Sequence, residues 1–340
     1  MEANLEGIVN ILKPPGMTSH DVISFLRRSL GIKKIGHCGT LDPQAAGVLP
    51  VCLNQATKLA DYLAGGEKSY YCEMRLGFET DTQDVWGAVT KAYPPAEAAF
   101  GGSQEETRQV LSSFEGEIQQ EVPAYSSVKR DGKSLHQYAR RGEPITGISR
   151  GVLIRSISLV ACDEKNIRFI VRCGGGTYVR MLCRDIGRKL GTGGVMSFLL
   201  RLEVGPFSIE ESSTLEEIAA LADAGRQGLP GSHAMDEVLY PKELALAHMP
   251  CLHAQAGDAD KLRHGQSVWL ADPTGAWQSL RGAVSAQHET QPAGRGESHA
   301  AQGKAWAKDD RGRLVALGSL SPGTGSKSGQ VLFKPDKTFA

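Results

Sequence analysis

Hydrophobic residues recur along this chain with two different spacings, which separate expected strands from expected helices. Short apolar or alternating runs predict strands at residues 7–12, 48–53, 68–77, 153–161, 166–173 and 195–207. Helical patterns predict helices at residues 19–30, 57–63, 105–114 and 132–142, and a further one that opens at 174–180 and ends at 190. The chain is therefore expected to be strand-rich with short helices between the strands, although these patterns alone do not give the strand order.

Two helix starts carry a capping pattern. Thr18 and Asp21 are spaced as a capping box, and Gly31 is placed to end the helix that follows. Ser213 and Glu216 have a similar spacing and predict a helix that runs through Leu221.

One glycine- and proline-bounded loop, at residues 36–50, stands out before an apolar run. Pro43 fixes its own backbone and biases Asp42 toward an extended conformation. A carboxylate on a stiff loop against a buried strand suits a reactive site. On local chemistry alone, a turn-capping role for Asp42 is the favoured interpretation.

Composition sets broad limits. A length of 340 residues with 41% hydrophobic content predicts a globular protein of two domains. No apolar run approaches the roughly 20 residues that a membrane helix needs, and no secretory signal is recognisable. The seven cysteines are scattered without a Cys-x-x-Cys pair, which argues against a zinc site or a disulfide framework and predicts a reducing, cytoplasmic setting.

The formal net charge is zero, but basic residues gather locally. Residues 126–155 include seven basic residues and only two acidic ones. The seven are Lys129, Arg130, Lys133, Arg140, Arg141, Arg150 and Arg155. This excess suits either a phosphate-binding face or an ordinary solvated surface, and both interpretations stay open on charge alone.

Several motifs occur in the order of a known family. His-Cys-Gly-Thr-Leu-Asp-Pro at residues 37–43, followed by Gly-Val-Leu, resembles the signature of the TruB family, the bacterial tRNA pseudouridine-55 synthases. Further resemblances are Lys-Pro-Pro-Gly-Met at 13–17, Lys-Ser-Tyr at 68–70, Thr-Asp-Thr-Gln-Asp at 80–84, the 122–129 segment, Gly-Thr-Tyr-Val-Arg at 176–180 and Leu-Leu-Arg-Leu at 199–202. The segment at 122–129 departs from the family at Ala124 and Ser127, and Gly175 is a further departure.

The resemblance implies a catalytic set. Asp42 matches the family's nucleophile, Tyr70 its base-stacking tyrosine and Arg180 the arginine that pairs with the aspartate. His37 matches the histidine beside the target nucleotide.

Other positions are implied to bind substrate. Lys13 either supports the loop or faces the RNA, and Asp84 either orients Arg180 or closes a turn. The remaining candidates for RNA contact are Tyr178, Leu200, Lys129, Arg140 and Arg141.

The family also implies the fold. It is α+β, with a mixed, largely antiparallel central sheet of the pseudouridine synthase type and flanking helices. On this basis residues 1–244 form the catalytic domain, with an RNA-clamping insertion at about 120–150. Residues 245–340 resemble a PUA-like RNA-binding domain with a flexible insertion at about 285–303. Residues 93–103 and 321–329 are expected to be surface loops.

The implied function is isomerisation of the T-loop uridine at position 55 of tRNA, flipped out of its loop, with a further role in tRNA folding. We expect no cofactor or metal, because the reaction is an isomerisation, and we expect a monomer that binds the T-arm stem-loop. A non-catalytic tRNA chaperone is the alternative. A guide-RNA-dependent synthase shares the nucleophile motif, but the absence of lysine-rich tails argues against a guide RNA.

Overall fold

The computed structural model describes residues 5–94, 104–227, 234–271, 303–322 and 330–339. Most of the surface loops expected at residues 93–103, 285–303 and 321–329 therefore lie outside the described residues. In the described part of the chain, no helix combines the length and the apolar character that crossing a membrane requires.

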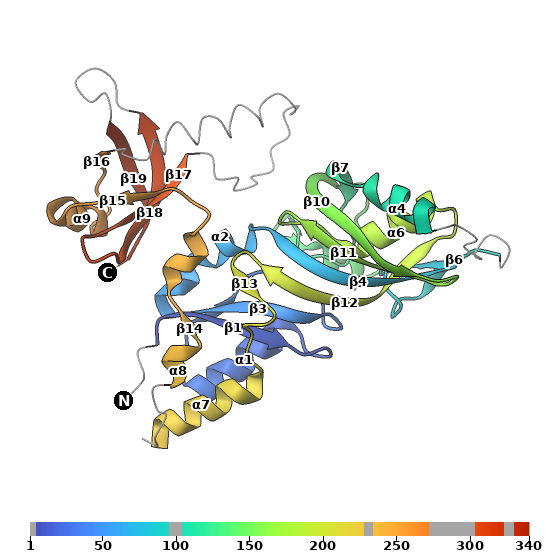
Figure 1. Cartoon of the computed structure of the whole chain (residues 1–340), viewed down its shortest axis with the longest axis horizontal. Helices are drawn as coiled ribbons and strands as arrows, with labels where there is room; N and C mark the ends of the chain where they lie inside the picture. The colour runs from blue at the N-terminus through green and yellow to red at the C-terminus, as the bar shows by residue number, and fades with distance from the viewer. Residues whose placement is uncertain (1–4, 95–103, 228–233, 272–302, 323–329, 340) are drawn as a thin grey trace.

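A large, largely antiparallel sheet forms the body of the molecule (Figure 1). Its strands are β1 (Gly7–Lys13), β2 (Ile35–His37), β3 (Ala46–Leu53), β4 (Lys68–Leu76), β7 (Gly116–Glu121), β10 (Ser149–Cys162), β11 (Asn166–Cys173), β12 (Gly194–Val204), β13 (Phe207–Ser208) and β14 (Leu239–Tyr240). The order is β14-β1-β3-β12-β4-β11-β10-β7, with β2 paired to β3 and β13 to β12. Among the described strands of this sheet, β12 and β3 pair in parallel and the other pairs are antiparallel. All six expected strands are present: residues 166–173 form β11 with the expected bounds, the other five have shifted ends, and the one expected at 195–207 is divided into β12 and β13. The expected mixed sheet is confirmed.

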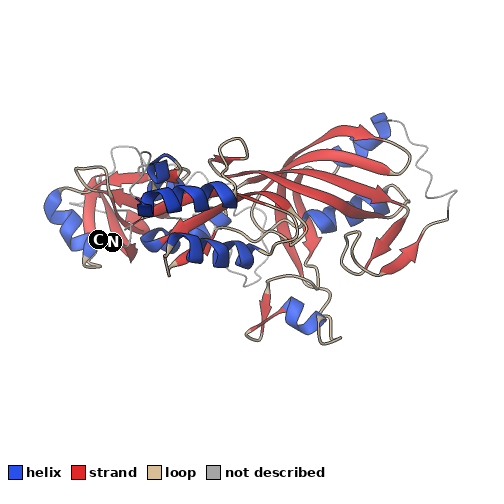
Figure 2. Ribbon diagram, turned by 90° about the horizontal axis from the view of Figure 1, so that it is seen from below, coloured by secondary structure: helices blue, strands red, loops and turns tan. Residues whose placement is uncertain are grey.

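Helices cover the sheet at both ends. They are α1 (Ser19–Leu30), α4 (Gln104–Ser112), α6 (Val179–Lys189) and α7 (Leu215–Gln227). Helices α1 and α7 lie side by side against the β1 end, as Figure 2 shows from below. Helices α4 and α6 pack near the other end (Figure 1).

The α1 prediction is confirmed at both ends. Thr18 and Asp21 form the capping box, and Gly31 takes a left-handed conformation with φ of 68°. The α7 prediction was wrong at its cap and its end. Thr214 and Glu217 exchange the capping hydrogen bonds, and the helix continues to Gln227.

Alternate residues of β4 face opposite sides of the sheet. Tyr70, Cys72 and Met74 join one buried cluster with Leu182 and Ile186 of α6. Tyr71 and Glu73 face the other side, where Tyr71 packs edge-on against Phe198. The α6 side of β4 is therefore the side on which Tyr70 lies.

Shorter elements connect these parts. They are the 3-10 helix η1 (Asn54–Leu59), α2 (Ala60–Ala64), the hairpin β5 (Phe78–Thr80) and β6 (Val89–Ala92), and α8 (Ala234–Glu237). The single helix expected at residues 57–63 is thus η1 followed by α2. The insertion contains a two-stranded sheet of β8 (Lys129–Arg130) and β9 (Lys133–Ser134), followed by α5 (Leu135–Ala139), which is shorter than the helix expected at 132–142.

A separate five-stranded sheet follows near the C-terminus, as expected for a small β-rich domain (Figure 1). The 3-10 helix η2 (Lys242–Leu246), which contacts η1 and α2, precedes this sheet. The domain's own elements are β15 (Cys251–His253), α9 (Ala256–Arg263), β16 (Val268–Ala271), β17 (Lys304–Lys308), β18 (Leu314–Pro322) and β19 (Gln330–Thr338). The strand order is β15-β17-β18-β19-β16. Its own core, which includes Val315, Leu320 and Phe333, is distinct from the cores of the main sheet.

Candidate active site

Asp42 and Arg180, which are 138 residues apart in the sequence, form an ion pair. The Arg180 Nε donates to Asp42 Oδ2 at 2.8 Å. The Asp42 side chain is 40% exposed, whereas that of Arg180 is 6% exposed. The buried guanidinium therefore orients a carboxylate that remains open to a ligand.

Arg180 also ties two other segments to the Asp42 loop. Its Nη1 donates to the Thr82 carbonyl at 2.8 Å and its Nη2 to the Tyr125 carbonyl at 3.1 Å. A planar guanidinium can serve all three acceptors at fixed angles. The residue thus holds together the loop at Asp42, the β5–β6 turn and the start of the basic insertion.

Lys13 lies beneath the Asp42 loop. It is fully buried, and its Nζ donates to the carbonyls of Pro14, Pro43 and Ala45 at 2.8, 3.1 and 2.7 Å. Burial and the nearby Arg201 charge lower the pKa of Lys13 to about 8. Because the ammonium is enclosed, Lys13 supports the loop, and the expectation that it contacts RNA does not fit its position.

Arg201 on β12 is a site residue that the sequence interpretation missed. It is fully buried, and it donates from Nε to the Val48 carbonyl at 2.7 Å and from Nη2 to the Gly39 carbonyl at 3.1 Å. The available signal was a charged residue inside an apolar strand, where burial requires hydrogen-bond partners. Arg201 therefore fixes both ends of the loop that carries Asp42.

Tyr70 lies next to Arg201 in the sheet register, on the α6 side. Its side chain is buried, and this burial raises the pKa of its phenol to about 12 even though Arg201 acts in the opposite sense. Tyr70 therefore remains a neutral hydrogen-bond donor at neutral pH.

Leu200 does not lie on the same face as Tyr70. Leu200 pairs with Tyr71 and Leu199 with Cys72, so Leu199 is the residue on the α6 side. Leu199 belongs to the same buried cluster as Leu41 and Tyr70. The substrate-binding role of Leu200 stays a prediction, and the register places it on the face opposite Tyr70.

His37 ends β2 at the start of the loop. Burial and then the Arg201 charge lower the pKa of His37 from its ordinary value of 6.5. Its Nδ1 is buried without a hydrogen-bond partner. The imidazole is therefore neutral at neutral pH.

Asp84 does not bond to Arg180. Its Oδ1 accepts from the Thr82 hydroxyl at 2.6 Å and from the Trp86 backbone N–H at 3.1 Å. Of the two roles that the sequence left open, the structure places Asp84 in the turn, where it fixes Thr82 and so acts on Arg180 indirectly.

Tyr178 precedes α6, and the Gln120 side chain fixes its backbone. Gln120 accepts from the Tyr178 N–H at 2.7 Å and donates to its carbonyl at 3.0 Å. The Arg150 guanidinium lies 4.7 Å from the centre of the Tyr178 ring. Lys129, Arg140 and Arg141 lie on the insertion and are exposed to solvent.

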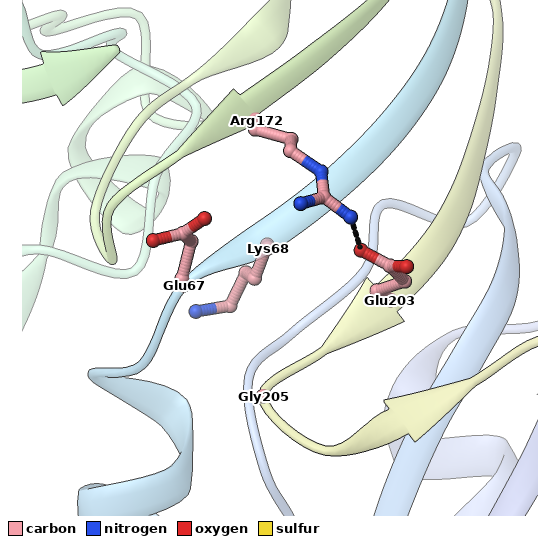
Figure 3. Close-up of a pocket in the computed structure, with 5 residues that line it drawn as sticks. All are labelled: Glu67, Lys68, Arg172, Glu203 and Gly205. Atoms are coloured by element: carbon pink, nitrogen blue, oxygen red, sulfur yellow. Dashed lines mark hydrogen bonds and ion pairs between the residues drawn. The ribbon is translucent and has the colours of Figure 1, made fainter. Parts of the chain in front are cut away.

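A separate cavity of about 280 Å³ lies at the start of β4 and at the ends of β11 and β12 (Figure 3). It is lined by Glu67, Lys68, Arg172, Glu203 and Gly205. An ion pair of 2.8 Å between Arg172 and Glu203 crosses one side. Lys68 is buried and donates to the carbonyls of Ala64 and Gly66 at 2.6 and 2.8 Å, and burial lowers its pKa to about 8. Asp42 does not line this cavity.

Family models match most of the described catalytic region. The model of the "TruB family pseudouridylate synthase (N terminal domain)" matches residues 27–179. The model of the "tRNA pseudouridylate synthase B C-terminal domain" matches residues 180–247. The first match contains Asp42 and Tyr70, and the second begins at Arg180.

Two individual proteins are similar in sequence to this chain over most of its length. The chain is 41% identical over 265 residues to tRNA pseudouridine synthase B of Alkaliphilus oremlandii, covering 78% of this chain and 83% of the relative. It is 49% identical over 216 residues to tRNA pseudouridine synthase B of Caldanaerobacter subterraneus subsp. tengcongensis, covering 63% of this chain and 74% of the relative.

Among solved structures, a Cbf5–Nop10–Gar1 complex contains a similar chain, with a TM-score of 0.69 and 25% identity over 99% of this chain and 84% of that one. A chain from an H/ACA RNP bound to a substrate RNA containing 2'-deoxyuridine also has a TM-score of 0.69, at 24% identity, covering 98% of this chain and 85% of that one. The latter likeness shows a shared fold.

Proposed function

The chain belongs to the TruB family of tRNA pseudouridine synthases, and we propose that it converts the uridine at position 55, in the T-loop of tRNA, into pseudouridine with Asp42 as nucleophile. The observation that carries this proposal is the pairing of a partly exposed Asp42 with a buried Arg180. A charge-assisted hydrogen bond of 2.8 Å holds the carboxylate in one orientation while one face stays open.

The reaction is an isomerisation of uridine. The bond between N1 of uracil and C1′ of the ribose breaks, the base turns, and a bond forms between C5 and C1′. The hydrogen on C5 leaves as a proton, and N1 gains one, so atoms and electrons balance without a redox partner. Asp42 acts either by attack on the substrate or by removal of a sugar proton, and both routes use the same carboxylate.

Tyr70 binds the flipped base, and His37 fills the gap that the base leaves. The Tyr70 ring stacks on uracil, a contact that stabilises by about 1–3 kcal/mol for one base. Its phenol stays protonated, since its pKa is raised to about 12. His37, whose pKa is lowered, is a neutral ring at the entrance to the loop and occupies the gap that the flipped base leaves.

The basic insertion holds the surrounding RNA. Lys129, Arg140 and Arg141 are exposed and free to meet phosphates of the T-arm stem. The Tyr125 carbonyl, at the start of this insertion, binds Arg180. RNA binding at the insertion therefore adjoins the reactive carboxylate.

An enzyme that acts without a guide RNA fits best. The relatives named tRNA pseudouridine synthase B are 41% and 49% identical to this chain, compared with 25% for the chain in the Cbf5–Nop10–Gar1 complex. The substrate on this proposal is tRNA itself.

The test is tritium release from a tRNA transcript that carries 5-³H-uridine. The native protein releases tritium, and Asp42→Asn, which keeps the shape of the side chain, releases none above background while binding tRNA normally. Asp61→Asn on α2, an exposed position, serves as the matched control and reacts like the native protein. Turnover by Asp42→Asn contradicts the nucleophile assignment. No release by the native protein, with tight tRNA binding, favours the chaperone alternative.

A further inference from the structure

Trp86 is an exposed aromatic residue with no part in the catalytic set described above. It lies in the turn between β5 and β6, and 52% of its surface is exposed. Val89, a few residues later on β6, is 61% exposed. A tryptophan this exposed is unusual, because its large apolar ring gains most from leaving water.

The turn that carries Trp86 is held rigidly. The Trp86 N–H donates to Asp84 Oδ1, and the Val85 N–H donates to the Met196 carbonyl on β12 at 3.0 Å. Gly87 follows with no room for a side chain, since an added Cβ would come within 2.2 Å of Thr82 Oγ1. The ring is thus presented from a fixed backbone, which reduces the entropy that a ligand contact has to overcome.

The same turn borders the reactive carboxylate. Asp84 Oδ1 accepts hydrogen bonds from both Trp86 and Thr82. The Thr82 carbonyl in turn accepts from Arg180, whose Nε binds Asp42. The backbone of Trp86 is therefore joined to Asp42 through a short chain of hydrogen bonds, so the turn that carries the exposed ring adjoins the Asp42–Arg180 pair.

The charges around Trp86 select the kind of contact. Asp81 and Asp84 are the ionisable residues of this turn, and both are acidic, so a phosphate would be repelled here. A nucleobase carries no charge and offers an aromatic face, and unstacked bases of RNA loops bind by stacking on such rings.

We propose that Trp86 stacks on a base of the substrate RNA that neighbours the flipped uridine in the loop. This inference rests on the proposed function, since it names a further contact of that same site. His37 fills the gap that the flipped uridine leaves, and the exposed indole ring offers a second stacking surface to a neighbouring base.

The experiment measures the Kd and single-turnover tritium release for a synthetic T-arm stem-loop RNA with three variants. Trp86→Leu keeps an apolar side chain but removes the ring, and Trp86→Phe keeps a ring. Phe198→Leu is the matched control, because it also replaces an exposed aromatic ring by leucine, on the face of the main sheet opposite Tyr70.

The expected result is a Kd for Trp86→Leu that is higher by about 5- to 150-fold, the range for loss of one base–aromatic stack. Trp86→Phe stays within about threefold of the native protein, and Phe198→Leu binds RNA as the native protein does. Tryptophan fluorescence is quenched by the RNA in the native protein, and less so in Trp86→Leu.

Two outcomes separate the two proposals. If the native protein releases tritium and Trp86→Leu binds and reacts equally well, the stacking inference is overturned and the function stands. If Trp86→Phe is as weak as Trp86→Leu, stacking is likewise rejected. If the native protein releases no tritium from RNA, the proposed function itself fails, whatever the Trp86 variants show.

Discussion

Three buried cations lie close to the Asp42 loop without binding the Asp42 carboxylate, and two of them, Lys13 and Arg201, hold the loop by hydrogen bonds. The hydrogen bonds of Lys13 and Arg201 end on carbonyls of the loop and its flanks, and those of Lys68 on carbonyls of the α2 end. Only the fourth cation, Arg180, has described bonds to Asp42 itself. The position of the carboxylate is therefore set by the backbone, and its orientation by Arg180.

The pKa of Lys13 leads to a prediction about stability. Its folded-state pKa is about 8, against an ordinary value of 10.5. Between these pH values the unfolded chain binds more protons at this site, so the contribution of Lys13 to the free energy of unfolding rises with pH. In Lys13→Met this contribution is absent.

The measurement is urea unfolding of both proteins from pH 7 to pH 10. The native protein becomes more stable relative to Lys13→Met by about 1–3 kcal/mol across this range. Other titrating groups affect both proteins equally and cancel in the difference. A difference that is flat with pH, or that falls, contradicts the depressed pKa.

Single residues differ in how far the sequence could predict them. The pairing of Asp42 with Arg180 was expected, but only because both lie in recognised motifs, since no local pattern joins residues 138 positions apart. Arg201 was missed because its partners, the carbonyls of Gly39 and Val48, are backbone atoms that leave no trace in residue types. The roles of the site residues remain predictions until they are tested by mutation.

At the scale of single elements, the sequence predicted the start of a helix correctly where only one capping pattern was present. The cap of α1 at Thr18 was such a case. Before α7, Ser213 and Thr214 are adjacent, so two overlapping capping patterns exist. The structure uses Thr214, because the Ser213 backbone is engaged with β1 through Asn10 and Leu12. The backbone hydrogen bonds between Ser213 and β1 therefore decided which of the two capping patterns starts α7.

The contact of β3 with β12 depends on a glycine. Gly47 has φ of +110°, and a Cβ there would come within 2.2 Å of the Arg201 carbonyl. Gly47→Ala therefore meets both an unfavourable backbone conformation and a clash with the backbone of β12. We expect a loss of at least about 3 kcal/mol in the free energy of unfolding.

Gly16→Ala is the matched comparison for this prediction. Gly16 has φ of +88° but no atom within 4 Å of an added Cβ, so it reports the conformational cost alone, about 1–2 kcal/mol. Thermal and urea unfolding of the two variants measure both costs. Equal destabilisation would mean that the close approach at Gly47 has no energetic importance.

At the scale of the whole molecule, the C-terminal sheet is attached to the main-sheet part of the chain, the expected catalytic domain, through its last strand. Lys58 of η1 donates to the Thr338 carbonyl at 2.6 Å, and Lys337 donates to the Lys58 carbonyl at 2.7 Å. Phe339 is 1% exposed and joins a cluster with Leu59 and other residues of the catalytic domain. The sequence resemblance in this part was weak, and it gave no indication of which surface the sheet would contact.

This attachment gives a final prediction about RNA binding. If the C-terminal domain contacts tRNA outside the T-arm, the two domains bind one RNA together, and loosening their contact lowers the affinity for tRNA. Phe339→Ala removes a buried ring from the interface and lowers the free energy of unfolding by about 3–5 kcal/mol. Its Kd for whole tRNA rises by about tenfold, because the second contact is no longer held in place.

The isolated T-arm stem-loop is the internal control for the same variant. This RNA reaches only the catalytic domain, so its Kd and its rate of tritium release stay close to those of the native protein at a temperature where the variant is folded. An equal loss for both RNAs would place the effect of Phe339 in the catalytic domain. An unchanged Kd for both would mean that the C-terminal domain does not contribute to tRNA binding through this interface.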